Sequence, residues 1–166
     1  MIIIKYLSLL LIVLICIYIG ELKAKSYANR VIELYNFQNS FLMLKNKIEF
    51  TYEPINNIFF EISKTIYENR ENAFEKTINQ DGEFYERWNE AISELKNIDL
   101  EDKEILKMFG KSLGKTDIKG QVNQINLSLN LIEKQIEKAE IEKNKNYKLY
   151  KTMGVISGMA ICIILL

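Results

Sequence analysis

The two ends of the chain restrict its fold more than any other feature, because each is a long run of apolar residues. Residues 2–20 hold one charge, Lys5, near their start, where a long side chain can reach the membrane surface. This run is long enough to cross a bilayer as a helix. A signal peptide would begin in the same way, but the GELKAKS that follows contains no convincing small-x-small cleavage site. We therefore predict an uncleaved transmembrane helix in residues 1–20.

The second apolar run, residues 152–166, is short for a membrane span. At about 1.5 Å per residue it gives about 22 Å of helix, against a hydrocarbon core of about 30 Å. Tyr147 and Tyr150 can lie at the interface, while Lys148 and Lys151 can extend to the headgroups. A buried core helix would need an apolar partner that so polar a chain does not offer. We predict a second transmembrane helix here, and whether it crosses fully stays open.

Basic residues flank both runs on the side of the intervening segment. They are Lys23, Lys25, Arg30, Lys138, Lys143, Lys145, Lys148 and Lys151, whereas the opposite side offers only Lys5 and the amino terminus. The positive-inside rule therefore predicts that residues 21–151 form a cytoplasmic domain and that both termini lie outside. In such antiparallel spans Cys16 and Cys162 lie toward opposite leaflets, so we expect them not to pair.

Some of these residues are also candidates for contact with anionic lipid or with a partner protein. They are Lys23, Lys25, Arg30, Lys143, Lys145, Lys148 and Lys151. The positive-inside bias predicts the same residues, so both interpretations stay open. Within the second run, Gly154 and Gly158 form a small-xxx-small spacing that lets a helix approach closely, either the first span or a helix of another protein.

Composition favours helices and excludes several kinds of chemistry. One proline and seven glycines leave few interior helix breakers. Without histidine, and with only two cysteines, the chain cannot build a Cys/His zinc site, and 22 basic residues balance 22 acidic ones, which does not indicate nucleic-acid binding. The carboxylates are expected on solvated helix faces. We therefore predict no enzyme activity, no metal and no cofactor.

Two apolar seams with spacings of three, four or seven residues predict the long helices of the domain. The first seam is Tyr27, Leu34, Phe37, Phe41, Leu44 and Ile48. The second seam is Ile118, Val122, Ile125, Leu129, Ile132, Ile136 and Ala139. These helices continue from the two membrane spans and should pack antiparallel. The predicted fold is all-α, an antiparallel bundle of five or six helices flanked by two transmembrane helices.

Local signals mark the shorter helices between the seams. Pro54 is expected at the first position of a helix, and one helix or two lie between it and the break at residues 79–82. The apolar face of this region is Ile55, Ile58, Phe59, Ile62 and Ile66. The next helix, ending near Asn97, holds Phe84, Trp88, Ile92 and Leu95. Asp99 then caps a helix whose predicted core face is Ile105, Met108, Phe109 and Leu113.

The stretch FGKSLGKTD, residues 109–117, shares letters with a nucleotide-binding loop. That loop needs four residues between its glycines and a strand before it, but here three residues separate Gly110 from Gly114 and the flanks are helical. Gly114 instead fits the left-handed residue after a helix, and Thr116 or Asp117 fits the cap of the next one. We predict a structural turn and no nucleotide binding.

Charge is unevenly distributed in the domain, since residues 49–104 hold fifteen acids and six bases. Lysines recur every four residues at Lys103, Lys107, Lys111, Lys115 and Lys119. The first three share one helix face. They form either a solvated face or a strip that binds an acidic surface of a partner.

The stretch FGKSLGKTDIKGQ, residues 109–121, also resembles the signature FG-x-x-LG-x-[ST]D-x-x-x-Q of the stage III sporulation protein AB family. Residues 147–166, 37–55 (FQNSFLMLKNKIEFTYEPI) and 87–92 (RWNEAI) support this resemblance, which covers essentially the whole chain. The chain departs from the family where Lys45 and Lys47 replace glutamates and Glu53 replaces a threonine.

The resemblance implies a scaffold component of the channel-like apparatus that joins mother cell and forespore. It also implies a soluble domain similar to the cytoplasmic helical domains of type II secretion platform proteins. Expected partners are the other proteins of the apparatus, including its cytoplasmic ATPase. The alternative is a two-span membrane sensor with a ligand-binding helical loop, but that needs the loop outside and a cytoplasmic signalling domain.

Overall fold

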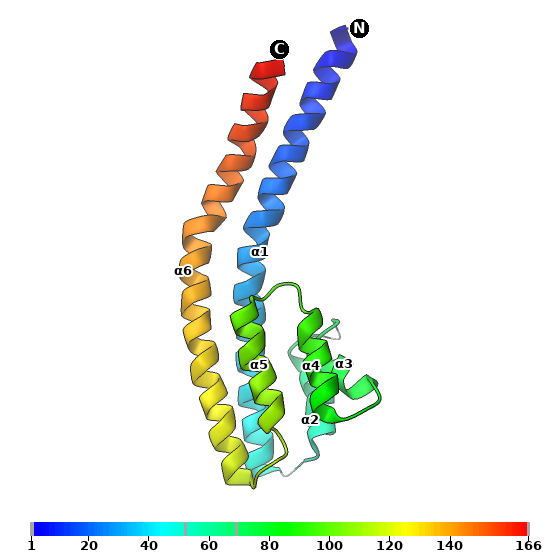
Figure 1. Cartoon of the computed structure of the whole chain (residues 1–166), viewed down its shortest axis with the longest axis vertical. Coiled ribbons are helices and arrows are strands. Elements are labelled where there is room, and N and C mark those ends of the chain that lie inside the picture. The colour runs from blue at the N-terminus through cyan, green and yellow to red at the C-terminus, as the bar shows by residue number, and fades with distance from the viewer. Residues whose placement is uncertain (1, 52, 69, 166) are drawn as a thin grey trace. The chain divides into compact units, whose positions relative to one another are not determined.

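The described part of the chain folds into six helices, arranged as in Figure 1. The computed structural model describes residues 2–51, 53–68 and 70–165, and for residues 2, 3 and 5 the backbone alone. The helices are α1 (Ile2–Phe50), α2 (Ile55–Thr65), α3 (Ala73–Asn79), α4 (Phe84–Glu94), α5 (Leu100–Ser112) and α6 (Ile118–Leu165). Within the described residues there is no strand, so the all-α prediction is confirmed. The predicted role of Lys5 rests on a side chain outside the described part.

The residues form two compact units, each described separately below. The apolar helix pair consists of α1 up to Val31 and α6 from Lys138 onward. The bundle consists of Ile32–Glu137 and holds the rest of α1 and α6 together with the four shorter helices.

Aromatic side chains fill the core of the bundle. The largest fully buried ones are Phe37, Phe41, Phe59, Phe74, Trp88 and Phe109. Phe41 stacks on Phe109 with ring centroids 4.0 Å apart, and the Trp88 ring contacts Phe74 edge to face at 5.3 Å. Such ring contacts stabilise beyond the area they bury. These six buried rings therefore form the core of the bundle, whereas Phe50 and Phe60 are exposed.

Most residues of both predicted seams lie in this core. Val122 and Leu129 are half-buried, and Tyr27 and Ala139 belong to the apolar helix pair. Leu34, Phe37, Phe41, Leu44 and Ile48 are buried on α1, and Ile125, Ile132 and Ile136 are buried on α6. Ile118 is the error, since 40% of its surface is exposed at the start of α6.

Capping side chains begin two of the shorter helices, α3 and α5. Asp99 and Asp102 form a capping box at the start of α5, so the predicted cap is confirmed. At α3 the side-chain oxygen of Asn72 accepts from the Glu75 N–H at 2.9 Å. Pro54 is the residue before α2, one position earlier than expected, with a φ of −59° that prepares the chain for a helix.

Two helices lie between Pro54 and Asn79, which decides between the one helix or two that the sequence left open. Two further details differ from the sequence predictions. Helix α4 ends at Glu94, three residues before the expected Asn97. On α5 the buried side chain is Leu106 in place of Ile105, while Met108 is 57% exposed and not part of the core. The buried face of this helix is therefore rotated from the predicted one toward Leu106 and Gly110, because Phe109, Gly110 and Leu106 meet α4 and α1 there.

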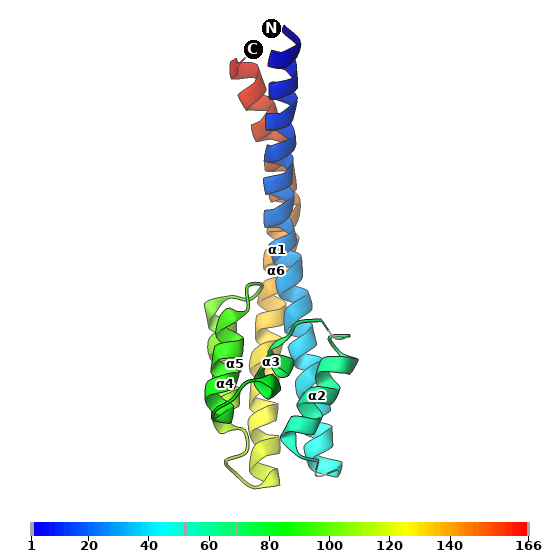
Figure 2. The same ribbon diagram turned by 90° about the vertical axis from the view of Figure 1, so that its right-hand side faces the viewer.

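The apolar helix pair is antiparallel, as Figures 1 and 2 show from two sides. Its contacts run in opposite directions along the two helices, from Tyr27 stacked on Tyr150 to the Cys162 thiol, which donates to the Leu9 carbonyl oxygen at 3.4 Å. Both α1 and α6 contain windows apolar enough to cross a membrane, with mean hydropathy of 2.2 and 1.5. Only 17% and 11% of these windows are buried, which is less than the core helix of a water-soluble fold buries.

Candidate functional site

Glycines set the closest contacts of the apolar helix pair. A Cβ atom at Gly154 would lie 2.9 Å from the Cys16 carbonyl oxygen and 3.2 Å from the Gly20 Cα. At Gly158 it would lie 3.2 Å from the Val13 Cα. The small-xxx-small spacing of α6 therefore faces the backbone of α1. Of the two helices expected to approach it, the first apolar run or a helix of another protein, the structure places the first one there. Cys16 and Cys162 are both free thiols.

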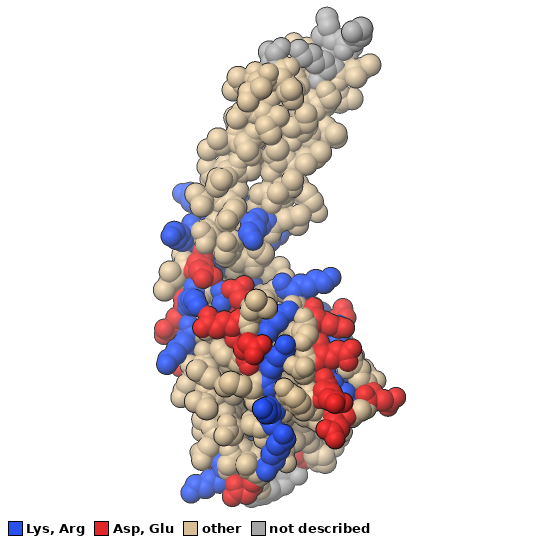
Figure 3. Space-filling view, viewed as in Figure 1, with Lys and Arg blue, Asp and Glu red and all other residues tan. Residues whose placement is uncertain are grey.

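Most of the candidate basic residues also belong to the apolar helix pair. Lys23, Lys25, Lys145, Lys148 and Lys151 are exposed and Lys143 is half-buried. Figure 3 shows Lys and Arg side chains where the uncharged part of the helix pair ends. Two of them lie near aromatic rings, with Lys23 Nζ 5.7 Å from the Tyr27 centroid and Lys151 Nζ 5.5 Å from the Tyr147 centroid. This combination of rings and cations is typical of a membrane interface.

Arg30 corrects the predicted basic surface. Its side chain is only 5% exposed, and its Nη1 donates to Glu142 Oε2 at 2.6 Å. A short charge-assisted bond of this kind between α1 and α6 holds the helices together. Arg30 therefore forms a buried ion pair with Glu142, and its side chain is not exposed for contact with a membrane surface.

The turn at residues 109–121 has the geometry of a helix end followed by a helix start. Gly114 has a φ of +76°, in the left-handed region that glycine adopts without strain. The Asp117 side chain accepts from the Gly120 N–H at 2.9 Å and so caps α6, while the Thr116 carbonyl oxygen accepts from the Gln121 side chain at 3.1 Å. Of the two expected caps, Asp117 is the one that the structure uses.

The first glycine of this stretch has a role that the sequence interpretation missed. A Cβ atom at Gly110 would lie 2.1 Å from Cδ1 of Trp88, so the indole ring occupies the space that a side chain would need. Trp88 Nε1 also donates to the Leu106 carbonyl oxygen at 2.7 Å. These contacts join α4 to α5. Both residues lie in motifs noted in the sequence, Trp88 in RWNEAI and Gly110 in FGKSLG. The spacing within each motif does not show that the two motifs are in contact.

A shallow pocket of about 390 Å³ borders the same turn. Its lining residues are Pro54, Ile55, Asn56, Phe84, Arg87, Leu113 and Gly114. The Arg87 guanidinium donates to the Thr77 and Gln80 carbonyl oxygens at 2.7 and 3.0 Å, which fixes its position in the wall. The turn therefore contributes to a surface depression as well as to the chain reversal.

Burial and hydrogen bonds shift the pKa of two titratable groups in the bundle, Glu33 and Lys47. Burial raises the pKa of the Glu33 carboxyl, and the charge of Arg70 opposes part of this rise. Hydrogen bonds from Lys47 to Glu61 and Glu53 raise the pKa of that lysine. Among the described residues, no three His, Cys, Asp or Glu side chains gather as metal ligands would.

The strip formed by Lys103, Lys107 and Lys111 follows the outer side of α5, in the bundle and not in the apolar helix pair. Lys111 is exposed, while Lys103 and Lys107 are half-buried. Next to it, α4 carries acidic residues three and four apart, which were not singled out from the sequence although their spacing is visible there.

A helical bundle formed between two long helices with apolar, mostly exposed ends defines a membrane protein with two candidate spans. Residues 5–166 match the sequence profile described as Stage III sporulation protein AB. The chain therefore belongs to the stage III sporulation protein AB family, and this membership gives it a role in sporulation and implies interaction with other sporulation proteins.

Two similar proteins bear the same description. Stage III sporulation protein AB of Bacillus subtilis strain 168 is 23% identical over 169 residues, covering 98% of this chain and 99% of that protein. A solved structure of Stage III sporulation protein AB (SpoIIIAB) superposes with a TM-score of 0.61 at 19% identity, covering 70% of this chain and 98% of that one. The structural likeness shows that the fold is shared.

Proposed function

We propose that this chain is a non-enzymatic, membrane-anchored scaffold in the channel-like apparatus between mother cell and forespore. The observation that carries the proposal is the pair of apolar, largely exposed helix ends on a helical domain, in a chain of the sporulation AB family. Residues 1–20 and 152–166 would lie in the membrane and residues 21–151 in the mother-cell cytoplasm, with both termini outside.

Charge supports this orientation. Residues 6–20 and 152–165 contain no charged residue, while basic side chains follow the first run and precede the second. The exposed members of this group, among them Lys145 and Lys148, can also attract anionic lipid headgroups, each by about 1 kcal/mol near the surface. The proposed protein partners are other components of the apparatus, including its cytoplasmic ATPase.

Cysteine labelling tests the orientation directly. The two native cysteines are replaced by alanine, and a single cysteine is placed at Ser93, which is exposed on α4. A membrane-impermeant maleimide should label this position only after the cells are permeabilised. A cysteine added after the last residue of the chain, on the side where the proposal places both termini, is the control for the opposite side and should be labelled in intact cells. Labelling at position 93 in intact cells contradicts the cytoplasmic domain.

Co-purification tests the role in assembly. The full chain, extracted in mild detergent from sporulating cells, should carry the ATPase and other apparatus proteins with it. A variant with Lys145→Glu and Lys148→Glu separates lipid contact from protein contact: reduced binding to anionic but not neutral vesicles, with co-purification intact, supports the lipid interpretation. Failure of the wild-type chain to co-purify any apparatus component contradicts the scaffold proposal.

A further inference from the structure

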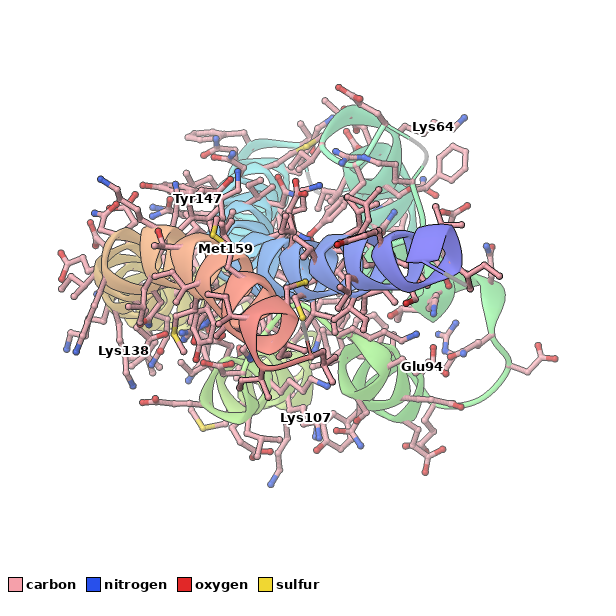
Figure 4. The ribbon with its side chains drawn as sticks, turned by 90° about the horizontal axis from the view of Figure 1, so that it is seen from above. Lys64, Glu94, Lys107, Lys138, Tyr147 and Met159 are labelled. Atoms are coloured by element: carbon pink, nitrogen blue, oxygen red, sulfur yellow. The ribbon has the colours of Figure 1, made fainter. Side chains whose placement is uncertain are left out.

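The outer faces of α4 and α5 carry opposite charges in two neighbouring stripes. The acidic stripe is Glu83, Glu86, Glu90 and Glu94, on α4 and the residue before it. The basic stripe is Lys103, Lys107, Lys111 and Lys115, on α5 and the turn after it. Spacings of three and four residues keep each helical set on one side of its helix. Figure 3 shows a run of lysines over α5 beside a run of acids over α4, and Figure 4 labels Glu94 and Lys107 on the two helices.

The two stripes do not neutralise each other within the chain. Glu94 pairs with Lys76 of α3 at 2.7 Å, Lys103 Nζ donates to the Ser93 carbonyl oxygen at 2.7 Å, and Lys107 lies 3.9 Å from Glu104 of its own helix. In the described part of the chain, no ion pair joins the acidic stripe to the basic stripe. Glu86, Glu90 and Lys111 are exposed. Both stripes therefore have exposed charged side chains that can contact a partner.

The core beneath holds the stripes at a fixed separation. Trp88 of α4 lies against Gly110 of α5, and its indole N–H donates to the Leu106 carbonyl oxygen of α5. The two helices are antiparallel neighbours, so the stripes run side by side (Figure 1). A rigid surface of this kind loses little conformational entropy when it binds.

We propose that this face pairs with the same face of a second copy of this chain, about a two-fold axis parallel to the stripes. Rotation about such an axis places the acidic stripe of each copy opposite the basic stripe of the other, so every contact is between unlike charges. A two-fold axis in the interface but perpendicular to the stripes would place like charges together. The charge pattern thus selects one symmetric arrangement, in which α4 of one copy faces α5 of the other.

Charge reversal in the full chain, purified in detergent micelles, tests this pairing by sedimentation equilibrium. One variant carries Lys107→Glu and Lys111→Glu, and another carries Glu86→Lys and Glu90→Lys. Each changes four contacts of the symmetric dimer from attractive to repulsive, so each should lower the self-association constant at least about tenfold. Wild-type association should also weaken between about 0.05 M and about 0.5 M salt, because exposed charges are screened.

Mixing gives the decisive result. The two variants, each monomeric alone, should form a mixed dimer, because one presents two acidic stripes and the other two basic ones. A chain with all four changes has exchanged stripes and should again pair with itself. Exposed reversals elsewhere in the bundle, Lys119→Glu with Lys134→Glu, are the matched control and should leave association unchanged.

Three results overturn the proposal. The wild-type chain is monomeric at all concentrations and salts, or the two variants fail to associate when mixed, or the control reversal is as damaging as the test reversals. If the lysine variant instead loses only another sporulation protein, the basic stripe binds an acidic surface of that protein and not a second copy. Co-purification of the apparatus is measured separately, so the scaffold role can stand if the pairing fails.

Discussion

Glycine permits close contact in both compact units, but the contact differs. In the apolar helix pair, Gly154 brings the backbone of α6 against the backbone of α1 at Cys16 and Gly20. In the bundle, Gly110 makes room for the ring of Trp88, the largest side chain of the core. Association in lipid lacks the hydrophobic driving force and depends on close van der Waals packing, whereas a fold in water is stabilised by burying large apolar groups.

The surfaces of the two units follow from this difference. In the helix pair, Leu11 is 60% exposed and Ile163 is 77% exposed, and few apolar side chains other than Leu9 and Ala24 are buried there. The bundle buries its aromatic residues and presents charged stripes outward. The helix pair therefore exposes the apolar surface expected of helices in lipid, while the bundle contains the buried groups that stabilise it.

The largest effect should come from filling the glycine space in the bundle. In Gly110→Ala the new methyl group meets Trp88, which cannot move because Phe37, Phe59, Phe74 and Phe109 surround it. Overpacking costs up to about 3 kcal/mol and the gain in helix propensity returns about 1 kcal/mol, so the free energy of unfolding should fall by up to about 2 kcal/mol. Urea unfolding of the full chain followed by far-UV circular dichroism measures it. Lys111→Ala, an exposed neighbour, should change little, and equal stability of the two variants would remove the proposed role of Gly110.

A smaller effect is expected from the same change of size in the helix pair. Gly154→Ile pushes against backbone atoms of α1 and should separate the two helices at a cost of about 1 kcal/mol, while the bundle keeps its stability. With Leu9→Cys added in a Cys16→Ala chain, oxidation should link this cysteine to Cys162, because the Cys162 sulfur lies 3.4 Å from the Leu9 carbonyl oxygen.

The rate of that cross-link measures the separation. It should fall about fivefold in Gly154→Ile, the factor that corresponds to about 1 kcal/mol. Ala160→Ile, at an exposed position of the same helix, is the control and should leave the rate unchanged. A drop in bundle stability equal to that of Gly110→Ala would mean that the two units do not use glycine differently.

The smallest effect concerns a partly buried carboxyl of the bundle. Burial raises the pKa of Glu33, so the folded state binds its proton more tightly than the unfolded chain does. This group's contribution to stability is therefore complete at acid pH and is lost as the pH rises through the folded-state pKa. Glu33→Gln should increase the free energy of unfolding at neutral pH by no more than about 1 kcal/mol and have no effect at acid pH.

Paired urea titrations at the two pH values measure this difference. Glu49→Gln, exposed on the same helix, should show no pH-dependent gain. For each pH, the free energy of unfolding of wild type is subtracted from that of Glu33→Gln. A smaller difference at neutral pH than at acid pH would refute the proposed surroundings of Glu33.

Much of the fold could be predicted because long helices repeat their pattern many times. The seam of α1 through Phe37 and Phe41 has enough repeats that its core face is unambiguous. On α5, a helix of 13 residues, Ile105 and Leu106 offer two apolar faces of nearly equal length, and the choice between Leu106 and Met108 depends on where α4 lies. That is tertiary information, which periodicity does not contain.

The break between α2 and α3 was uncertain for a related reason. No glycine or proline marks it, and the chain turns at Glu68, which has a φ of +52°. The available signal was Asn72 followed three residues later by Glu75, a cap pattern that the structure uses. The interaction surfaces were least predictable, because the acidic stripe becomes meaningful only when α4 lies beside the lysines of α5.

Trp88 gives the bundle an intrinsic optical probe. It is the single tryptophan of the chain, it is fully buried, and its N–H is bound to the Leu106 carbonyl oxygen. Its emission therefore arises from one site that joins α4 to α5 beneath both stripes. Unlabelled protein in a membrane can report through the wavelength and lifetime of this indole whether those two helices shift when a partner arrives.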